Sequence, residues 1–169
     1  MAFAILATGS KHKCKKSNMG SLKIKEAHIN RDENYEGIAK HADPKLKDLN
    51  QNLIGDGDIY SAVKREIDPI KYRPNQTGNN EPVVSYDLLL TASPEYFYEV
   101  DQDKNCTYKK REDYDKRLKD WTEKTKAYLE KEHYCVAASL HLDETTPHIH
   151  ATAVPFQKNA EGIYDKTMT

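Results

Sequence analysis

With 169 residues, the chain is long enough to bury one hydrophobic core and is expected to form one domain. Charged residues make up 31% of it and hydrophobic residues 37%, and no apolar run approaches the roughly 20 residues of a membrane-spanning helix, so the composition favours a soluble protein over a membrane protein. The net charge of −1 by itself indicates no class of partner.

The opening segment AFAILAT, residues 2–8, is apolar but short and has no basic segment before it. We therefore expect a first strand there and not a signal peptide. The three cysteines, Cys14, Cys106 and Cys135, lie far apart and form no C-x-x-C pair. An odd number of scattered cysteines argues against a disulfide framework and predicts a reducing, cytoplasmic compartment.

Positive charge is concentrated near the N-terminus, where six lysines and one histidine lie between residues 11 and 25 and no acid occurs before Glu26. Clustered lysines can contact phosphates, because they displace the counterions of a nucleic-acid backbone. A solvated basic loop is the alternative interpretation, and the cluster alone does not decide between the two. The lysines are Lys11, Lys13, Lys15, Lys16, Lys23 and Lys25.

Between the lysine cluster and residue 110, the pattern predicts short elements joined by loops. Leucine and isoleucine residues after Pro44 indicate a short helix, and Asp56 or Asp58 is expected to cap the helix that follows. Prolines and asparagines then mark a loop before an apolar strand, which is expected to be central in its sheet. In chain order we predict a helix over 59–67, a loop over 68–82, a strand over 83–91, a short helix over 94–100 and a loop over 101–108.

The clearest helix lies between residues 111 and 132, where large side chains recur at steps of three and four residues. A stripe of this kind is nearly always core packing, so Trp121 is assigned to the core and the helix is expected to cover one face of a sheet. The stripe consists of Tyr114, Leu118, Trp121, Thr125, Tyr128 and Leu129.

Two strands, 134–142 and 148–156, are predicted to form a hairpin whose tight turn contains Pro147. Side chains alternate between the two faces of a strand, so their parity sorts them. If the apolar face packs under the 111–132 helix, three histidines project together from the face without a helix. The apolar face is expected to hold Val136, Ala138, Leu140, Ile149, Ala151 and Ala153, and the other face Cys135, Ala137, Ser139, His141, His148, His150 and Thr152.

The three histidines form a candidate metal site. His148 and His150 stand at i and i+2 of a strand and project side by side, and His141 of the neighbouring strand supplies a third imidazole. Three protein ligands with open positions are typical of a catalytic metal site. Surface histidines of a polar sheet are the alternative, but three convergent imidazoles beside Asp143 and Glu144 favour a metal. Imidazoles suit zinc, iron, nickel or copper better than magnesium, so the ligands do not identify the ion.

The stretch H-L-D-E-T-T-P-H-I-H-A at 141–151 resembles the metal motif of the plasmid mobilisation and recombination (Mob/Pre, MobV-type) relaxases, a branch of the HUH endonucleases. The HUH name refers to two histidines on either side of a hydrophobic residue, here His148, Ile149 and His150. The match includes the intervening D-E-T-T-P and continues into A-T-A-V-P-F, so it is more specific than an H-x-H pair alone.

A second region resembles the same family. S-L-K-I-K-E-A-H-I-N-R at 21–31 is followed by D-P-K-L-K-D-L-N-Q-N-L-I at 43–54. The predicted order also agrees, with a first strand, a basic segment, a middle strand, a long helix and then the metal hairpin. The resemblance covers most of the chain, and 55–110 is its least similar part.

The resemblance implies a metal-dependent relaxase that nicks one strand of DNA at a plasmid transfer origin and thereby initiates conjugative mobilisation. Such an enzyme keeps the 5′-phosphate as a covalent adduct and frees a 3′-hydroxyl. The implied partner is single-stranded origin DNA with an inverted repeat, in the cytoplasm of a bacterium. The implied cofactor is a divalent metal, Mn²⁺ or Mg²⁺, with Zn²⁺ also compatible with the histidine ligands.

The branch resembled here is associated with an N-terminal histidine nucleophile, which by its place in A-H-I-N-R is His28. Without the resemblance, the residues around His28 would favour a histidine on the surface of a helix. Beside this nucleophile we expect Arg31 to hold the phosphate and Glu144 to orient the His28 ring, while Asp143 would support a metal histidine. The runner-up nucleophiles are Tyr35 and His41.

We therefore predict an α+β fold with a mostly antiparallel sheet, helices packed on one face and the metal and DNA site on the other. Residues 1–169 are expected to form a single relaxase domain that lacks the family's C-terminal helical region, through which a dimer would form. Two alternatives remain open. One is a cupin-type three-histidine metal enzyme, which would need many short strands, and the other is a DNA-binding replication or plasmid-control domain without nicking activity.

Overall fold

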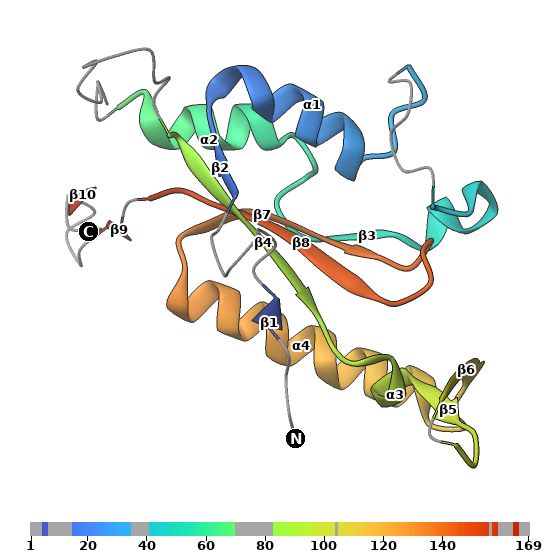
Figure 1. Cartoon of the computed structure of the whole chain (residues 1–169). Coiled ribbons are helices and arrows are strands. Elements are labelled where there is room, and N and C mark those ends of the chain that lie inside the picture. Colours follow the sequence, from blue (N-terminus) through green and yellow to red (C-terminus); the bar gives the residue numbers. More distant parts are fainter. Residues whose placement is uncertain are drawn as a thin grey trace.

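The computed structural model describes residues 5–6, 15–34, 41–69, 83–103, 105–155, 157–158 and 164–165. Its centre is an antiparallel sheet in which β4, β8, β7 and β3 lie side by side in that order (Figure 1). The outer edge of β4 pairs with β2 along Ser85–Asp87 and with β1 along Leu89 and Leu90. Strand β4 therefore has partners on both sides, as its apolar sequence predicts.

The described elements, in chain order, are β1 (Ile5–Leu6), β2 (Lys15–Ser17), α1 (Met19–Ile29), the 3₁₀ helix η1 (Pro44–Leu49), β3 (Gln51–Ile54), α2 (Ile59–Ile67), β4 (Ser85–Thr91), α3 (Pro94–Phe97), β5 (Tyr98–Val100), β6 (Cys106–Lys110), α4 (Tyr114–Glu132), β7 (Cys135–His141), β8 (His148–Ala153), β9 (Gln157–Lys158) and β10 (Tyr164–Asp165). The long helix, the hairpin and the 59–67 helix are confirmed, and Asp58 caps α2 by accepting a hydrogen bond from the Ser61 amide.

Helix α4 covers one face of the sheet, as its stripe predicts (Figure 1). Trp121 is 1% exposed and packs edge-on against Phe97, with ring centroids 5.5 Å apart. Apolar residues of three neighbouring strands line the other side of this core. They are Leu88, Leu90, Ala138, Leu140, Ile149 and Ala151.

Helices α1 and α2 pack on the opposite face of the sheet, which is the face that carries the histidines (Figure 1). Their core joins Leu22 and Ile29 of α1 to Val63 of α2 and to Ala137 of β7. The α+β class with an antiparallel sheet is confirmed, but the expectation that helices cover only one face is wrong. The error has a physical cause: α1 includes the last two lysines of the lysine cluster, and its charged residues conceal the apolar side that it buries.

A β-bulge changes the face assignment at the start of β7. Cys135 and Ala137 pair with Ala153 and Thr152, which are adjacent, so Val136 is an extra residue in its strand. Cys135 therefore packs against the α4 core and Val136 against the α1–α2 core, opposite to the simple alternation. From Ala138 onward the alternation holds, so the predicted faces of the histidines are unaffected.

Three other regions differ from the sequence prediction. Helix α1 was not predicted; it begins with a reciprocal capping box between Asn18 and Ser21. The 94–100 segment is helical only as α3 and continues into β5, which pairs with β6, a strand that begins within the predicted 101–108 loop. None of the described helices combines the length and apolar character needed to cross a membrane.

We predict that Trp121→Ala lowers the free energy of unfolding by about 3–5 kcal/mol, because it removes a fully buried ring and leaves a cavity under the sheet. Urea unfolding followed by circular dichroism measures this. Lys119→Ala, on the exposed side of α4, is the control and should change stability by less than about 0.5 kcal/mol. Equal effects of the two variants would contradict the packing of α4 on the sheet.

Candidate functional site

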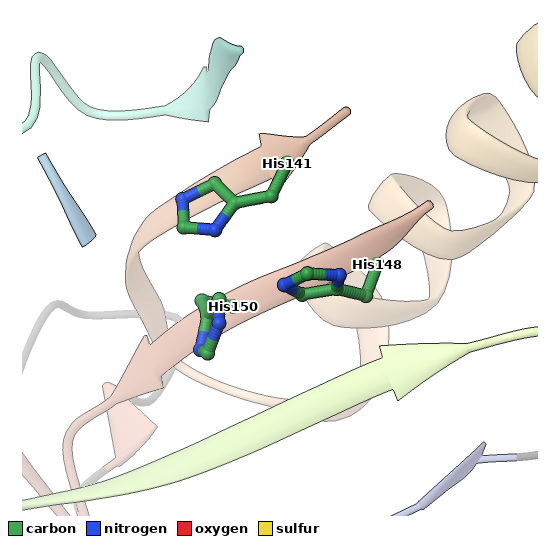
Figure 2. A group of neighbouring side chains, drawn as sticks. All are labelled: His141, His148 and His150. Atoms are coloured by element: carbon green, nitrogen blue, oxygen red, sulfur yellow. The ribbon is translucent and has the colours of Figure 1, made fainter. Parts of the chain in front are cut away.

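His141, His148 and His150 converge at the hairpin end of β7 and β8. His141 and His148 are direct cross-strand partners, and His150 follows two residues along β8 on the same face. Their ring centroids are 4.8–5.2 Å apart, and one nitrogen from each ring lies within 4.8 Å of the others. The three rings point toward a common centre (Figure 2).

Burial keeps two of these imidazoles neutral. His141 has no exposed surface, and its burial lowers its pKa to about 3, with the charges of Arg31 and His148 acting in the same direction. Burial likewise lowers the pKa of His150 to about 2, aided by the neighbouring histidines. A neutral imidazole offers a lone pair, so neither ring has to lose a proton at neutral pH before it binds a cation.

The hydrogen bonds of the rings leave a nitrogen of each of two histidines facing the centre. His148 Nδ1 lies 3.0 Å from the Thr146 carbonyl oxygen, which can only accept, so Nδ1 carries the proton and Nε2 the lone pair. His141 Nδ1 lies 3.0 Å from Arg31 Nη2, which can only donate, so an Nδ1 that accepts from it leaves the ring proton on the buried Nε2. No described residue makes a hydrogen bond to Nε2, and this nitrogen can bind a metal in the tautomer that carries the proton on Nδ1.

His28 lies at the C-terminal end of α1, beside the three histidines. Its ring stands edge-on to the ring of His150, with centroids 5.7 Å apart. The side chain is half-buried, so it is not the surface histidine that the helix pattern alone would favour. The fold therefore brings a fourth imidazole from a segment more than one hundred residues away to the edge of the candidate metal site.

Arg31 occupies the left-handed position that ends α1, with φ of 54°, where glycine is the usual residue. Amide hydrogen bonds from Arg31 to the His28 carbonyl and from Asp32 to the Ala27 carbonyl close the helix end. An arginine at this position has a backbone cost of about 1 kcal/mol that a glycine would not have. The contacts of its side chain explain why it is tolerated.

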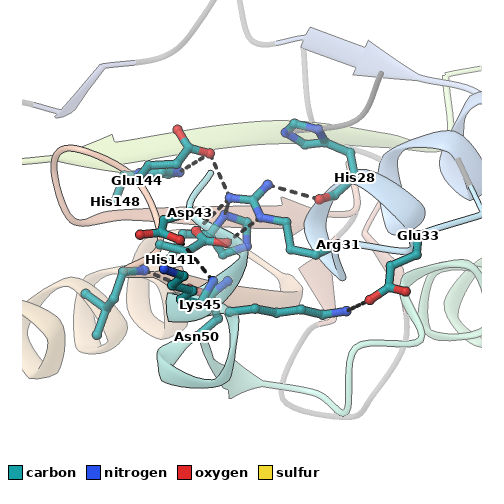
Figure 3. Close-up of polar contacts among 12 residues, drawn as sticks. His28, Arg31, Glu33, Asp43, Lys45, Asn50, His141, Glu144 and His148 are labelled. Atoms are coloured by element: carbon teal, nitrogen blue, oxygen red, sulfur yellow. Dashed lines mark hydrogen bonds and ion pairs between the residues drawn. The ribbon is translucent and has the colours of Figure 1, made fainter. Parts of the chain in front are cut away.

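The Arg31 guanidinium is 7% exposed and joins α1 to the turn of the metal hairpin (Figure 3). It makes a two-pronged ion pair with Asp143, with Nε–Oδ2 at 2.7 Å and Nη2–Oδ1 at 2.9 Å. Nη2 is also 2.7 Å from Glu144, and Nη1 donates to the His28 carbonyl oxygen at 3.1 Å. Paired planar groups of this kind fix geometry as well as charge.

These contacts shift the ionisation of both partners. Burial acts to lower the pKa of Arg31, but Asp143 and Glu144 raise it above its ordinary value. Burial acts to raise the pKa of Asp143, but the hydrogen bonds and charge of Arg31 outweigh it and the pKa is lowered to about 2. Both groups therefore remain charged across the physiological range. Asp143 and Glu144 are thus held by the Arg31 guanidinium. Glu144 also lies near the three-histidine cluster, with its Oε1 4.0 Å from His148 Nε2.

Four residues that the sequence did not single out hold the turn between β7 and β8. Asn50 accepts a hydrogen bond from the Leu142 amide, and the Asp43 amide donates to the Asp143 carbonyl. On the α4 side, the Tyr98 hydroxyl donates to the Thr145 carbonyl and the Thr91 hydroxyl to the Pro147 carbonyl. Hydrogen bonds to the backbone between distant segments leave no local signal, so the sequence could not identify them.

The predicted DNA-binding lysines fall into three groups. Lys23 is exposed, with its ammonium 5.1 Å from the centre of the Tyr60 ring, whereas Lys25 forms an ion pair with Asp87. For Lys15 and Lys16 the structure describes only their place in β2. Lys11 and Lys13 lie outside the described residues, as does the runner-up nucleophile Tyr35, and the other runner-up, His41, is exposed.

Residues 9–169 match the family of plasmid recombination enzymes called Mob_Pre. The chain belongs to this family. The resemblance carried by the H-L-D-E-T-T-P-H-I-H motif is thereby confirmed, and with the fold it excludes the cupin-type alternative, because helices cover both faces of the sheet.

A curated protein and several solved structures are similar to the chain. The 65 kDa protein of Zymomonas mobilis subsp. mobilis is 29% identical over 141 residues, which are 83% of this chain but 22% of that protein. This chain thus spans about a fifth of the length of the curated relative.

Among solved structures, the Mn-bound MobM relaxase domain with pMV158 oriT DNA of 22 nucleotides has a TM-score of 0.61 at 21% identity, covering 91% of this chain and 72% of that one. The complex with a 3′-thiophosphate has a TM-score of 0.60 at 23% identity, with the same coverage. At these identities the likeness shows a shared fold.

We predict that His148→Ala weakens Mn²⁺ binding by more than about 100-fold, because even the groups that orient metal ligands contribute 10–100-fold. Isothermal titration with MnCl₂ measures the affinity. His133→Ala is the matched control, since His133 hydrogen-bonds Tyr86 and lies outside the three-histidine cluster. If both variants bind Mn²⁺ like the unmodified chain, the histidines are not its ligands.

Acid should destabilise the metal-free protein through His141 and His150. Below about pH 6.5 the unfolded chain protonates these imidazoles, while burial keeps the folded ones neutral down to pH 3 or lower. Each histidine therefore lowers the free energy of unfolding by at most about 1.4 kcal/mol per pH unit as the pH falls from 6.5.

Urea unfolding from pH 7 to pH 4 in EDTA measures this slope. His150→Gln cannot be protonated and should flatten it, and an unchanged slope would contradict the lowered pKa.

Proposed function

We propose that this chain is the DNA-nicking domain of a plasmid relaxase, with His28 as the nucleophile that attacks one phosphodiester of a transfer origin. The observation that supports this most is the position of the His28 ring, 5.7 Å from the ring of His150 at the edge of a three-histidine cluster. Membership in the plasmid recombination enzyme family and the MobM fold, solved with oriT DNA, support the same reaction.

In the proposed step, a ring nitrogen of His28 forms a bond to phosphorus and the bond from phosphorus to the 3′-oxygen breaks. The 5′-phosphate stays on the attacking nitrogen, the ring loses the proton of its other nitrogen to solvent, and the leaving 3′-oxygen gains a proton. The attacking nitrogen needs a free lone pair, which a neutral imidazole has at physiological pH. The covalent adduct preserves the energy of the cleaved ester for rejoining the strand and starting conjugative mobilisation.

His141, His148 and His150 would hold a divalent metal, and the buried, unpaired Nε2 of His141 fits this assignment. When bound there, the ion supplies positive charge against the charge that develops on the scissile phosphate. We propose Mn²⁺ or Mg²⁺ as the ion, with Zn²⁺ also compatible with the ligands. The Mn-bound MobM crystals support manganese.

Arg31 is proposed to orient the nucleophile. Its guanidinium is nearly buried and is engaged by Asp143 and Glu144, which leaves little of it for the phosphate that the motif alone would assign to it. Through Nη1 it holds the carbonyl of His28 itself. Glu144 remains our candidate for orienting the His28 ring, because Arg31 places its carboxylate beside the end of α1.

The proposed partner is single-stranded origin DNA with an inverted repeat, and the proposed location is the bacterial cytoplasm. Dimerisation through a C-terminal helical region is a property we propose for the longer family members. A DNA-binding control domain without nicking would share the fold and the metal, so covalent chemistry is the property that separates the two functions.

The test uses labelled single-stranded oligonucleotides that cover the DNA upstream of the gene, incubated with the protein and MnCl₂. We expect a protein–DNA adduct that survives denaturing electrophoresis and is destroyed by mild acid, because a phosphorus–nitrogen bond to imidazole is acid-labile. His28→Ala should abolish the adduct, while Tyr35→Phe and His41→Ala should retain it.

An acid-stable adduct that Tyr35→Phe removes would transfer the nucleophile to tyrosine. Specific DNA binding without any adduct would favour the control domain.

A further inference from the structure

Helix α1 is fixed to the sheet at two successive points along β8. His28 lies beside His150, and one turn earlier Lys25 reaches Thr152, with its Nζ 2.5 Å from the hydroxyl oxygen. Residues three apart lie on the same side of a helix, so both side chains face the sheet. The second partner of Lys25 is Asp87 of β4, which is the cross-strand neighbour of Thr152.

The Lys25–Asp87 ion pair is more buried than the other lysine–carboxylate pairs of the described residues. Its side chains are 13% and 17% exposed, whereas those of the Lys64–Asp68 pair on α2 are 49% and 57% exposed. Exposed pairs contribute little, but removing one partner of a buried pair leaves an uncompensated charge. The Lys25 contact is therefore expected to constrain α1 in a way that surface pairs do not.

Arg31 fixes the end of α1 to the hairpin turn, and Glu26 accepts a hydrogen bond from the Tyr60 amide of α2, but the contacts that α1 makes with the sheet beside Lys25 are mainly apolar. Leu22, Ala27 and Ile29 are buried, and apolar burial holds a helix against a sheet without specifying its position along the sheet closely. An ion pair that also contacts a hydroxyl is directional. A reacting group that is displaced by about 1 Å can lose about 100-fold in rate, so the position of α1 along β8 matters for His28.

We propose that Lys25 is a positioning residue, which fixes α1 on β4 and β8 so that the His28 ring faces the scissile phosphate. This assignment rests on the proposed nicking function and replaces the expectation that Lys25 binds DNA. A lysine side chain that is 13% exposed and paired with a carboxylate has few counterions to displace from a phosphate backbone. Lys23, which is exposed on the same helix, is the lysine of α1 that remains a DNA contact.

The experiment compares Lys25→Met with Lys64→Met, which removes an exposed lysine–aspartate pair from a neighbouring helix. Single-turnover cleavage of the oligonucleotide identified above is measured at saturating DNA, together with Mn²⁺ affinity and the salt dependence of DNA binding. For Lys25→Met we expect cleavage to slow by roughly 10- to 100-fold, with Mn²⁺ affinity and salt dependence unchanged. Lys64→Met should match the unmodified chain in all three.

A second variant separates positioning from general destabilisation. Lys25→Arg keeps the charge and should recover part of the cleavage rate. Asp87→Asn should slow cleavage as Lys25→Met does, and the double variant should be no slower than the slower single one, because the pair acts as a unit. A DNA-binding role would instead lower the salt slope by about one and leave cleavage at saturating DNA intact, which would overturn the proposal.

Failure of the nicking function would be visible separately. If the unmodified chain forms no adduct with any oligonucleotide, the proposed function is wrong. The ion pair is then tested by urea unfolding of four proteins: the unmodified chain, Lys25→Met, Asp87→Asn and the double variant. Non-additive midpoints of the single and double variants support the Lys25–Asp87 link between α1 and the sheet. Additive midpoints would overturn it whatever the function.

Discussion

The geometry of the site depends on the ion pair between Arg31 and Asp143, which lie 112 positions apart in the chain. It joins the end of α1 to the turn between β7 and β8, so the helix that carries His28 and the hairpin that carries the three histidines form one structure. Both Arg31 and Asp143 are nearly fully buried, and such a pair is stable only when each charge is fully satisfied. Glu144 and the His28 carbonyl complete the hydrogen bonding of the guanidinium.

The sheet supplies the second constraint. Antiparallel pairing places His141 opposite His148, and the two-residue alternation places His150 on the same face. A shift of one residue in the pairing would turn the histidines of one strand into the α4 core. The apolar residues on the reverse side, among them Leu140 and Ile149, resist such a shift, so the packing under α4 also maintains the metal ligands.

Burial, charge and hydrogen bonding act together on the chemistry of this cluster. Helices α1 and α2 cover the histidine face, and that burial keeps His141 and His150 neutral, which a cation ligand requires. The same enclosure would be costly for unpaired carboxylates, and the Arg31 guanidinium forms ion pairs with both Asp143 and Glu144. One face of the sheet thus accommodates a set of neutral ligands and an ion-pair network a few ångströms apart.

The sequence by itself determined the features that depend on residues close together along the chain. The α4 stripe, the histidine hairpin and the family motif are local patterns, because helix and strand periodicity decide which side chains share a face. Only the tertiary structure decided how α1 docks, since its contacts reach residues far along the chain. The docking of α1 places His28 beside His150 and allows Arg31 to form ion pairs with two carboxylates. It also pairs Lys25 with Asp87. The same docking covered the face expected to be free, and a bulge at Val136 placed Cys135 and Val136 on the faces opposite to those that alternation predicts.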